Sequence, residues 1–309
     1  MAASSWATSG ADAVARALAA DRSAVDRTLA AWTDRYVAEG YGTVGEAMRY
    51  SLLGPGKRLR PILVLGCYRA VGGAGGGDAV PLAVTVEVVH AYSLVHDDLP
   101  CMDDDAVRRG RPTTHRVFGA RVAALAGVAM VALAVRWAVD AARALGLPRG
   151  LSTGIVQELM RASGAGGMVG GQLLDLAGEG RMLAERELER VHTGKTGSLI
   201  VAAARIGGMA GGCDDRCLAA LGRFGRALGL AFQIADDVLD ATATTTQLGK
   251  TAGADVARRK STYVTLLGVD GARGRAGELV AEARVALADA GLLTPLLDHL
   301  AQFAIARIA

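Results

Sequence analysis

The sequence predicts an all-α protein, and three observations support this prediction. Ala, Val and Leu supply most of the 51% apolar content and Gly is also frequent, whereas aromatic residues make up only 4%. Small apolar side chains favour packed helices over a β-sandwich, which draws more on Val, Ile, Tyr and Thr. Apolar residues recur at spacings of three and four, and no segment alternates like a strand. No convincing linker divides the chain, so we expect a single all-α domain over residues 1–309.

The expected helices follow one another with short breaks. Gly54-Pro55-Gly56 ends the second helix, Arg60-Pro61 opens the third with proline in its first turn, and Pro81 opens the fourth. The full set is expected at residues 11–39, 43–53, from 60 onward, 81–95, 117–145, 151–165, 184–211, 214–240, 262–268, 274–290 and 293–308.

Charge and targeting patterns exclude several classes of protein. A net charge of +3 is too small for a nucleic-acid binder. The N-terminus lacks the basic and apolar regions of a signal peptide. The apolar run 122–135 is short for a membrane span and predicts a buried core helix. No cysteine belongs to a CxxC pair, which favours a reducing cytoplasm; the four are Cys67, Cys101, Cys213 and Cys217.

An acidic segment, HDDLPCMDDD, follows the fourth apolar helix and holds five aspartates within nine residues. On a continued helix, Asp103 would lie about 240° around the axis from Asp97. Pro100 disfavours helical geometry at Leu99 and cannot donate an amide hydrogen bond. We therefore expect the chain to leave the helix and bring Asp103 back toward Asp97 and Asp98.

A second acidic segment, FQIADDVLD, ends another apolar helix about 140 residues later. Helical geometry places Gln233, Asp236, Asp237 and Asp240 on one face. Two such helices facing each other would present six carboxylates across a gap, and oxygen ligands of this kind suit Mg²⁺ shared with substrate phosphates. The two segments together predict a site for Mg²⁺ and a diphosphate.

Basic residues recur beside these acidic segments. The segment GKRLRP (56–61) lies at a helix start, where free backbone amides add positive potential. Further basic groups occur at 108–110, 195–197, 249–250 and 258–262. Their repeated position predicts that the site binds diphosphate groups.

The chain resembles the trans-isoprenyl diphosphate synthases, of the short-chain farnesyl or geranylgeranyl type. The likeness extends from about Gly56 to Gly268 and rests on HDDLPCMDDDAVRRGRPTTH, GMVGGQLLDL, HTGKTGSLI, GLAFQIADDVLD and, less closely, GKTAGADVARRKSTY. It implies an isoprenoid synthase-type bundle around a deep cavity, a cytoplasmic homodimer, and three Mg²⁺ ions per site with substrate bound. It also implies condensation of isopentenyl diphosphate with an allylic diphosphate.

The resemblance assigns roles to matched positions. Isopentenyl diphosphate would be held by Lys57, Arg58, His90 and Arg109. The allylic diphosphate would be held by Arg108, Lys195, Thr196, Gln233 and Lys250, with Lys260 a further basic position. The metal ligands would be Asp97, Asp98, Asp103, Asp236, Asp237 and Asp240, and Lys195 would assist ionisation with these carboxylates.

Product length depends on the residues below Asp97. Tyr92 and Ser93 precede it by five and four residues, and Tyr92 would lie about 7.5 Å lower along the helix. A bulky Tyr92 in the tunnel wall would act as a floor and favour a C15 product. If Tyr92 only packs against its neighbours, a C20 product fits.

The chain departs from the family pattern at Val128 and Ala106, where acids are common, at Ala254, where lysine is common, and at Val264, where proline is common. Two other functions compete with a synthase. A class I terpene cyclase would not need the isopentenyl site and would show an Asn/Ser/Glu second motif. A regulatory subunit of a heteromeric synthase typically loses aspartates, whereas here all six are present.

Overall fold

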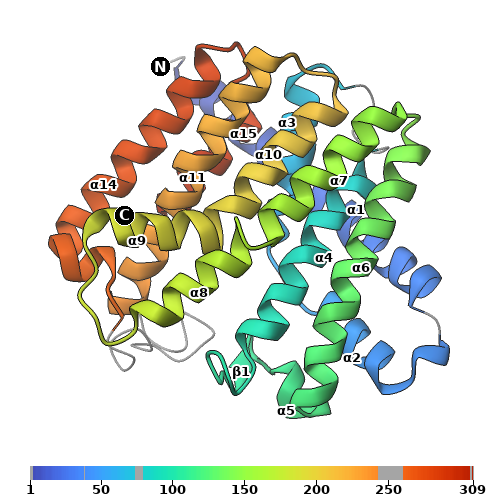
Figure 1. Ribbon diagram of the computed structural model, residues 1–309. Coiled ribbons are helices and arrows are strands. Elements are labelled where there is room, and N and C mark those ends of the chain that lie inside the picture. Colours follow the sequence, from blue (N-terminus) through green and yellow to red (C-terminus); the bar gives the residue numbers. More distant parts are fainter. Residues whose placement is uncertain (1–2, 38, 74–78, 243–259, 307, 309) are drawn as a thin grey trace.

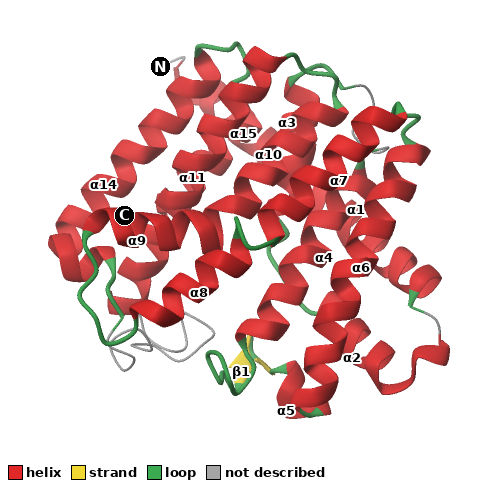
Figure 2. Ribbon diagram, viewed as in Figure 1, coloured by secondary structure: helices red, strands yellow, loops and turns green. Residues whose placement is uncertain are grey.

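A computed structural model describes residues 3–37, 39–73, 79–242, 260–306 and 308, which form a helical bundle with one two-stranded hairpin (Figures 1 and 2). The first half comprises α1 (Ala3–Tyr36), the 3₁₀ turn η1 (Glu39–Tyr41), α2 (Gly42–Leu52), α3 (Leu59–Ala70), α4 (Val80–Asp97), β1 (Val107–Arg108), β2 (Arg111–Pro112), α5 (Thr114–Phe118) and α6 (Ala120–Ala144). The second half comprises α7 (Arg149–Ser163), α8 (Met168–Gly178), α9 (Glu185–His192), the π-helical turn η2 (Thr193–Gly197), α10 (Ser198–Ala210), α11 (Asp215–Thr242), α14 (Tyr263–Ala288) and α15 (Pro295–Ala306).

The all-α prediction is confirmed, and the differences from it have local causes. The segment 117–145 divides into α5 and α6 at Gly119, whose φ of 83° is not helical. The two short helices expected near 262–290 are one element, α14, with a kink at Gly268. Helix α8 was not predicted separately, and the segment 184–211 divides into α9, η2 and α10.

Two inner helices position the site. Helix α4 packs against α6 and α3, while α10 packs against α3, α11 and α7 (Figure 1). Most of α4 is buried, which explains its nearly continuous apolar sequence. Thr85 and Glu87 are buried within the helix, whereas Ser93 and Asp97 near its C-terminal end line a cavity.

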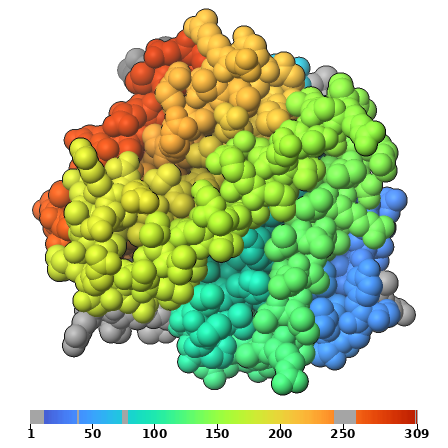
Figure 3. Space-filling view, viewed as in Figure 1, coloured from blue at the N-terminus to red at the C-terminus, as the bar shows by residue number. Residues whose placement is uncertain are grey.

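Helix α6 contributes only one face to the core. Met130 and Trp137 are fully buried, whereas Leu125 and Val128 are 53% and 62% exposed. By length and composition alone α6 could cross a membrane, although core helices often pass the same test. The core helix predicted over 122–135 is therefore buried on one side, and its other side lies at the surface shown in Figure 3.

Candidate active site

The turn after α4 brings the two ends of the first acidic segment together. The helix ends at Asp97, and the amide of Asp103 donates to the Asp97 carbonyl at 2.8 Å. The amides of Met102 and Asp104 both donate to the Leu99 carbonyl. Because Pro100 disfavours a helical Leu99, these bonds form a compact turn in place of another helical turn. Asp97 and Asp103 consequently line the same cavity.

This cavity, of about 230 Å³, lies where the C-terminal end of α4 meets α8, η2 and α11. It gathers most of the residues that the sequence singles out. Its described lining includes Arg60, His90, Ser93, Leu94, Asp97, Asp103, Asp105, Arg108, Met168, Asp175, His192, Lys195, Thr196, Leu199, Gln233, Asp236, Asp237, Lys260, Ser261 and Thr262.

Two of the six predicted metal ligands do not line the cavity. Asp98 is buried and accepts a hydrogen bond from Arg108 Nε at 2.8 Å and another from its Nη2. Asp240 is also buried, on the same helix as Asp236. Asp98 therefore orients Arg108, and neither carboxylate faces the cavity directly.

Asp237 lines the cavity but has protein partners for both oxygens. Gln233 Nε2 donates to Oδ1 at 3.1 Å, and the backbone amide of Tyr263 donates to Oδ2 at 3.0 Å. The bond from Tyr263 joins α11 to the start of α14. Asp97, Asp103 and Asp236 are the other predicted ligands that line the cavity.

The electrostatics of Asp97 reflect its burial near other carboxylates. The pKa of Asp97 is raised to about 6, because the effects of burial and of nearby Asp103 outweigh the opposing charges of Lys195 and Arg108. A cation close to a carboxyl group in this environment stabilises its ionised form. The acidic side of the cavity is therefore suited to a cation.

Lys195 and Lys260 reach the cavity from different elements and meet at one carboxylate. The two Nζ atoms donate to Asp175 Oδ2 at 2.6 Å and 2.8 Å. Burial alone would raise the pKa of Asp175, but the two ammonium groups outweigh it and lower the pKa to about 2. Lys260 Nζ also lies 3.7 Å from Asp103 Oδ1. Asp175 thus anchors both lysines, a role that the sequence analysis did not assign.

Lys195 and Thr196 are placed by the π-helical turn η2, a type of turn that often marks functional sites. Thr196 donates to Gln233 Oε1 at 2.7 Å. A Cβ on Gly171 of α8 would lie 2.0 Å from the Lys195 amide nitrogen, so only glycine permits this approach. Close packing of α8 against η2 therefore sets the position of Lys195.

The opposite charge dominates another part of the cavity, around His90. Its Nε2 lies 3.3 Å from Arg60 Nη1 and 3.1 Å from Arg109 Nη2. Burial, followed by the charges of these arginines, holds the pKa of His90 well below its usual range. Guanidinium groups only donate, so His90 is a neutral acceptor at Nε2.

Arg58 requires a correction, because the structure does not place it in this cavity. Its side chain is buried in ion pairs with Glu87 and Asp26, at 2.7 Å and 2.8 Å. Arg60, which the sequence analysis placed at the helix start without a substrate role, lines the cavity instead. Lys57 is exposed nearby, with Nζ 5.5 Å from the centre of the Phe303 ring.

The proposed chain-length residues differ in their surroundings. Ser93 lines the cavity. Tyr92 is buried, and its hydroxyl donates to the Ser163 carbonyl at the end of α7 at 3.0 Å. Tyr92 does not belong to the described lining of the cavity. Its role as a floor remains a prediction.

The three departures from the family pattern that fall within the described residues do not line the cavity. Val128 and Ala106 are exposed, and Val264 is half-buried at the start of α14. Lys250 and Ala254 lie outside the described residues, so the predicted diphosphate contact of Lys250 has no structural account.

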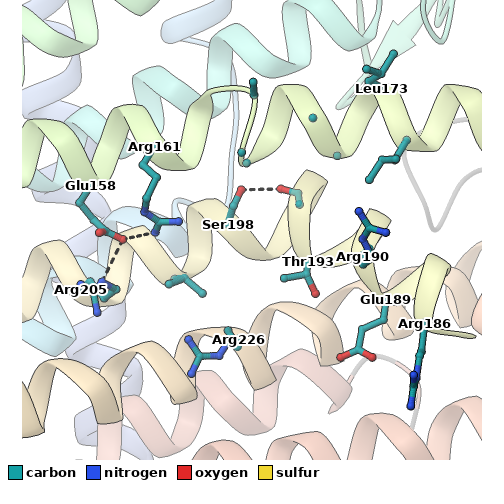
Figure 4. Close-up of a pocket in the computed structure, with 18 residues that line it drawn as sticks. Glu158, Arg161, Leu173, Arg186, Glu189, Arg190, Thr193, Ser198, Arg205 and Arg226 are labelled. Carbon is teal, nitrogen blue, oxygen red and sulfur yellow. Dashed lines mark hydrogen bonds and ion pairs between the residues drawn. The ribbon is translucent and has the colours of Figure 1, made fainter.

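A larger hollow, of about 1040 Å³, is lined by residues of α7, α8, α9, α10 and α11 and by the start of η2 (Figure 4). Thr193 and Gly194 line it, whereas Lys195 and Thr196 of the same turn line the smaller cavity. Five arginines surround this hollow: Arg161, Arg186, Arg190, Arg205 and Arg226. None of the predicted site residues lines it, so the smaller cavity is the candidate active site.

The acidic side of the cavity fits Mg²⁺ that is shared with a ligand. Within the described ranges, no three His, Cys, Asp or Glu side chains converge as a ready metal site. Mg²⁺ commonly binds one or two carboxylates and completes its shell with water and substrate phosphates. Asp97 and Asp103 from the α4 turn and Asp236 from α11 supply such oxygens around one cavity.

An all-α bundle whose central cavity carries aspartates, lysines and an arginine cluster defines an enzyme that binds diphosphates. Residues 42–284 match the family model described as polyprenyl synthetase. The chain is 45% identical over 272 residues to geranylgeranyl pyrophosphate synthase 6, mitochondrial, of Arabidopsis thaliana, covering 85% of this chain and 80% of the relative. It is 45% identical over 268 residues to farnesyl diphosphate synthase of Escherichia coli (strain K12), covering 85% and 89%.

Solved structures agree with these relatives. An apo FPP/GFPP synthase from Zymomonas mobilis superposes with a TM-score of 0.82 at 32% identity, covering 95% of this chain and 100% of the other. A geranyltransferase from Helicobacter pylori, complexed with magnesium and isoprenyl diphosphate, superposes with a TM-score of 0.80 at 30% identity, covering 93% and 96%.

The chain belongs to the polyprenyl synthetase family. It is a trans-prenyltransferase of the short-chain farnesyl or geranylgeranyl diphosphate synthase type. The relatives described above favour neither a terpene cyclase nor a regulatory subunit.

Proposed function

We propose that the enzyme condenses isopentenyl diphosphate with an allylic diphosphate in the cavity between α4, α8, η2 and α11. One observation carries this proposal: two separate groups of cationic side chains lie at one cavity, and Arg109, outside the cavity lining, joins one of these groups through His90. Lys195 and Lys260 lie beside the aspartates, and Arg60 and Arg109 meet at His90. Two cationic subsites suit a reaction between two diphosphates.

The allylic diphosphate would bind beside the aspartates. Lys195, Thr196 and Lys260 would contact its oxygens, with Arg108 held in place by Asp98. Asp97, Asp103 and Asp236 would hold Mg²⁺, for which we propose three ions per site. Bound Mg²⁺ supplies Lewis-acid stabilisation of the negative charge that develops on the leaving diphosphate.

Isopentenyl diphosphate would bind at the arginine side. Lys57, Arg60 and Arg109 are the cationic groups there, and His90 orients the two guanidinium groups as an acceptor. This assignment replaces Arg58 by Arg60.

The reaction would proceed by ionisation, attack and proton loss. The allylic carbon–oxygen bond breaks, its electron pair leaves with the diphosphate, and Lys195 and Lys260 stabilise the charge. The double bond of isopentenyl diphosphate then forms the new carbon–carbon bond. The resulting cation loses a proton to the released diphosphate. Leu94, Met168 and Leu199 line the cavity and limit the access of water to the cation.

The test is to incubate the protein with isopentenyl diphosphate, Mg²⁺ and each allylic primer of one, two or three isoprene units, and to measure product length. We expect a C15 or C20 diphosphate and no product when Mg²⁺ is chelated. A cyclic hydrocarbon formed without isopentenyl diphosphate would instead support a cyclase.

We further propose that two copies associate through the exposed side of α6. Leu125, Val128 and Ala132 recur on this side at spacings of three and four. Such an apolar stripe on a helix whose other face is already buried suits a helix–helix contact. Many members of the family have an acidic residue at the position of Val128. Valine therefore makes this stripe more apolar than an acidic residue would.

A further inference from the structure

A strained turn begins the arginine side of the active site. Arg58, at the N-terminal boundary of α3, has a left-handed φ of 54°, a conformation that non-glycine residues rarely adopt. Among the described residues, only Arg58, Asp104 and Arg109 combine a side chain with a positive φ. Two of these three lie at the same cluster of arginines. Backbone strain at a defined site requires surrounding contacts that hold it in place.

Those contacts occupy the whole guanidinium group of Arg58. Nε donates to Asp26 Oδ1 at 2.8 Å, Nη1 donates to Glu87 Oε1 at 2.7 Å, and Nη2 donates to the Gly54 carbonyl at 2.7 Å. The side chain therefore connects α1, α4 and the turn before α3. A group with these partners, and only 6% exposed, does not bind a diphosphate directly.

Glu87 is the counter-ion shared by the cluster. It is 3% exposed on α4 and lies one helical turn before His90. Burial lowers the pKa values of Arg60 and Arg109, and the charge of Glu87 opposes this effect at both residues. Glu87 thus helps several guanidinium groups to remain charged in one small region.

The turn also holds Arg109, which comes from the hairpin. Arg109 Nη1 donates to the Pro55 carbonyl at 2.9 Å. A Cβ on Gly56 would lie 2.8 Å from Arg109 Nη1 and 3.0 Å from Arg58 Nη1, so both guanidinium groups pack against this glycine. The position of Arg109 consequently depends on the turn that Arg58 fixes.

We propose that Arg58 and Glu87 are positioning residues, which fix the turn 54–58 and thereby place Lys57, Arg60 and Arg109 for one diphosphate. The pair acts through its neighbours and does not touch the substrate. This inference rests on the proposed function, because it assigns the arginine side to isopentenyl diphosphate. It predicts a selective effect on that substrate and little effect on the allylic one.

The test compares Arg58→Met with the double variant Arg58→Met/Glu87→Met. The single variant leaves Glu87 buried without its partner and is expected to be destabilised. The double variant replaces both charges by apolar side chains and should recover much of the thermal stability. Both variants should bind isopentenyl diphosphate with a Kd about 10- to 100-fold higher than that of the wild type, because small displacements of positioned groups have effects of this size.

Arg69→Met provides the matched control. Arg69 lies on the same helix and pairs with Asp21 of α1 through two hydrogen bonds of 2.8 Å and 2.6 Å, away from the cavity. Loss of this pair should lower stability without changing the affinity for isopentenyl diphosphate. If Arg58 had a purely structural role, Arg58→Met would behave like Arg69→Met: stability would fall, and the affinity for isopentenyl diphosphate would not change.

Affinity for isopentenyl diphosphate is measured by calorimetry without Mg²⁺, and steady-state KM values are then measured for both substrates. The expected pattern is a raised Kd and KM for isopentenyl diphosphate and a KM for the allylic diphosphate within about threefold of wild type, a change of under 1 kcal/mol. Wild-type affinity in the double variant would overturn the positioning role alone. Failure of the wild-type chain to bind isopentenyl diphosphate would overturn the proposed function as well.

Discussion

Lys195 Nζ lies 2.6 Å from Asp175 Oδ2, so that a lysine on the π turn is held by a carboxylate on α8. Lys260 shares the same oxygen. The Asp175 oxygen therefore restrains the side chains of both lysines. The cationic groups beside the aspartates are therefore in place before a diphosphate arrives.

Asp175→Asn should weaken this arrangement and lower turnover at least tenfold, because correctly placed charges contribute strongly to stabilising a leaving group. Stability should also respond to pH. The carboxyl pKa of about 2 lies below its unfolded value, so Asp175 contributes about 2 kcal/mol above pH 4, and this contribution is lost as pH falls from about 4 to 2. Urea unfolding at pH 7 and pH 3 measures the difference.

The control for that experiment is Asp270→Asn, since the Asp270 side chain is fully exposed and pairs with Arg273 one turn away. It should change neither turnover nor the pH dependence of unfolding. Equal pH profiles for wild type and Asp175→Asn would contradict the anchoring role.

Asp97→Asn and Asp236→Asn should each lower turnover about a hundredfold or more at saturating Mg²⁺, because each removes a charged ligand from the proposed metal site. Far-ultraviolet circular dichroism should remain unchanged. Asp104→Asn is the matched control within the same acidic segment. Asp104 pairs with Arg116, lies outside the described cavity lining, and has a left-handed backbone that asparagine tolerates. Full activity of Asp97→Asn would refute the metal assignment.

Ser93→Phe should shorten the product, because Ser93 lines the cavity and a phenyl ring would fill space below Asp97. Tyr92→Ala should lengthen it if the tyrosine ring closes the tunnel. Chromatography of dephosphorylated products measures both effects. Tyr92→Phe controls for the hydrogen bond to Ser163 and should lower stability by about 1 kcal/mol without changing product length. An unchanged product from Tyr92→Ala would leave Tyr92 with a packing role only.

Leu125→Glu should shift the protein toward monomers, because it places a charge in the proposed contact of α6. Sedimentation velocity at several protein concentrations measures the change. Val285→Glu is the control, since Val285 is 56% exposed on α14 and outside that stripe. A monomeric wild-type protein at micromolar concentration would argue against the proposed contact.

The sequence predicts the helices well because their apolar spacing and breakers act locally. Pro100 and the spacing of the aspartates were sufficient to predict the turn that returns Asp103 to Asp97. Helix α8 escaped prediction because its glycines weaken the helical pattern, and those glycines serve close packing against η2. The π-helical turn η2 has no periodic pattern of apolar residues that would predict it from the sequence.

The choice between Arg58 and Arg60 could not be made from the sequence. Both lie in one short basic segment, and only tertiary partners separate them: Glu87 and Asp26 bind Arg58, whereas Arg60 faces the cavity. Asp175 was missed for a similar reason, because its lysine partners are 20 and 85 residues away along the chain. Long-range ion pairs assign roles that local spacing leaves open.

The backbone bond from Asp103 to Asp97 keeps two carboxylates close together whether or not a cation is present. The repulsion between these carboxylates destabilises the folded chain, and Mg²⁺ bound with diphosphate, as we propose, would reduce it. Ligands that bind only the folded state reduce the unfolded population, which cellular proteases degrade. The supply of precursors should thus influence how long each enzyme molecule survives, in addition to how fast it works.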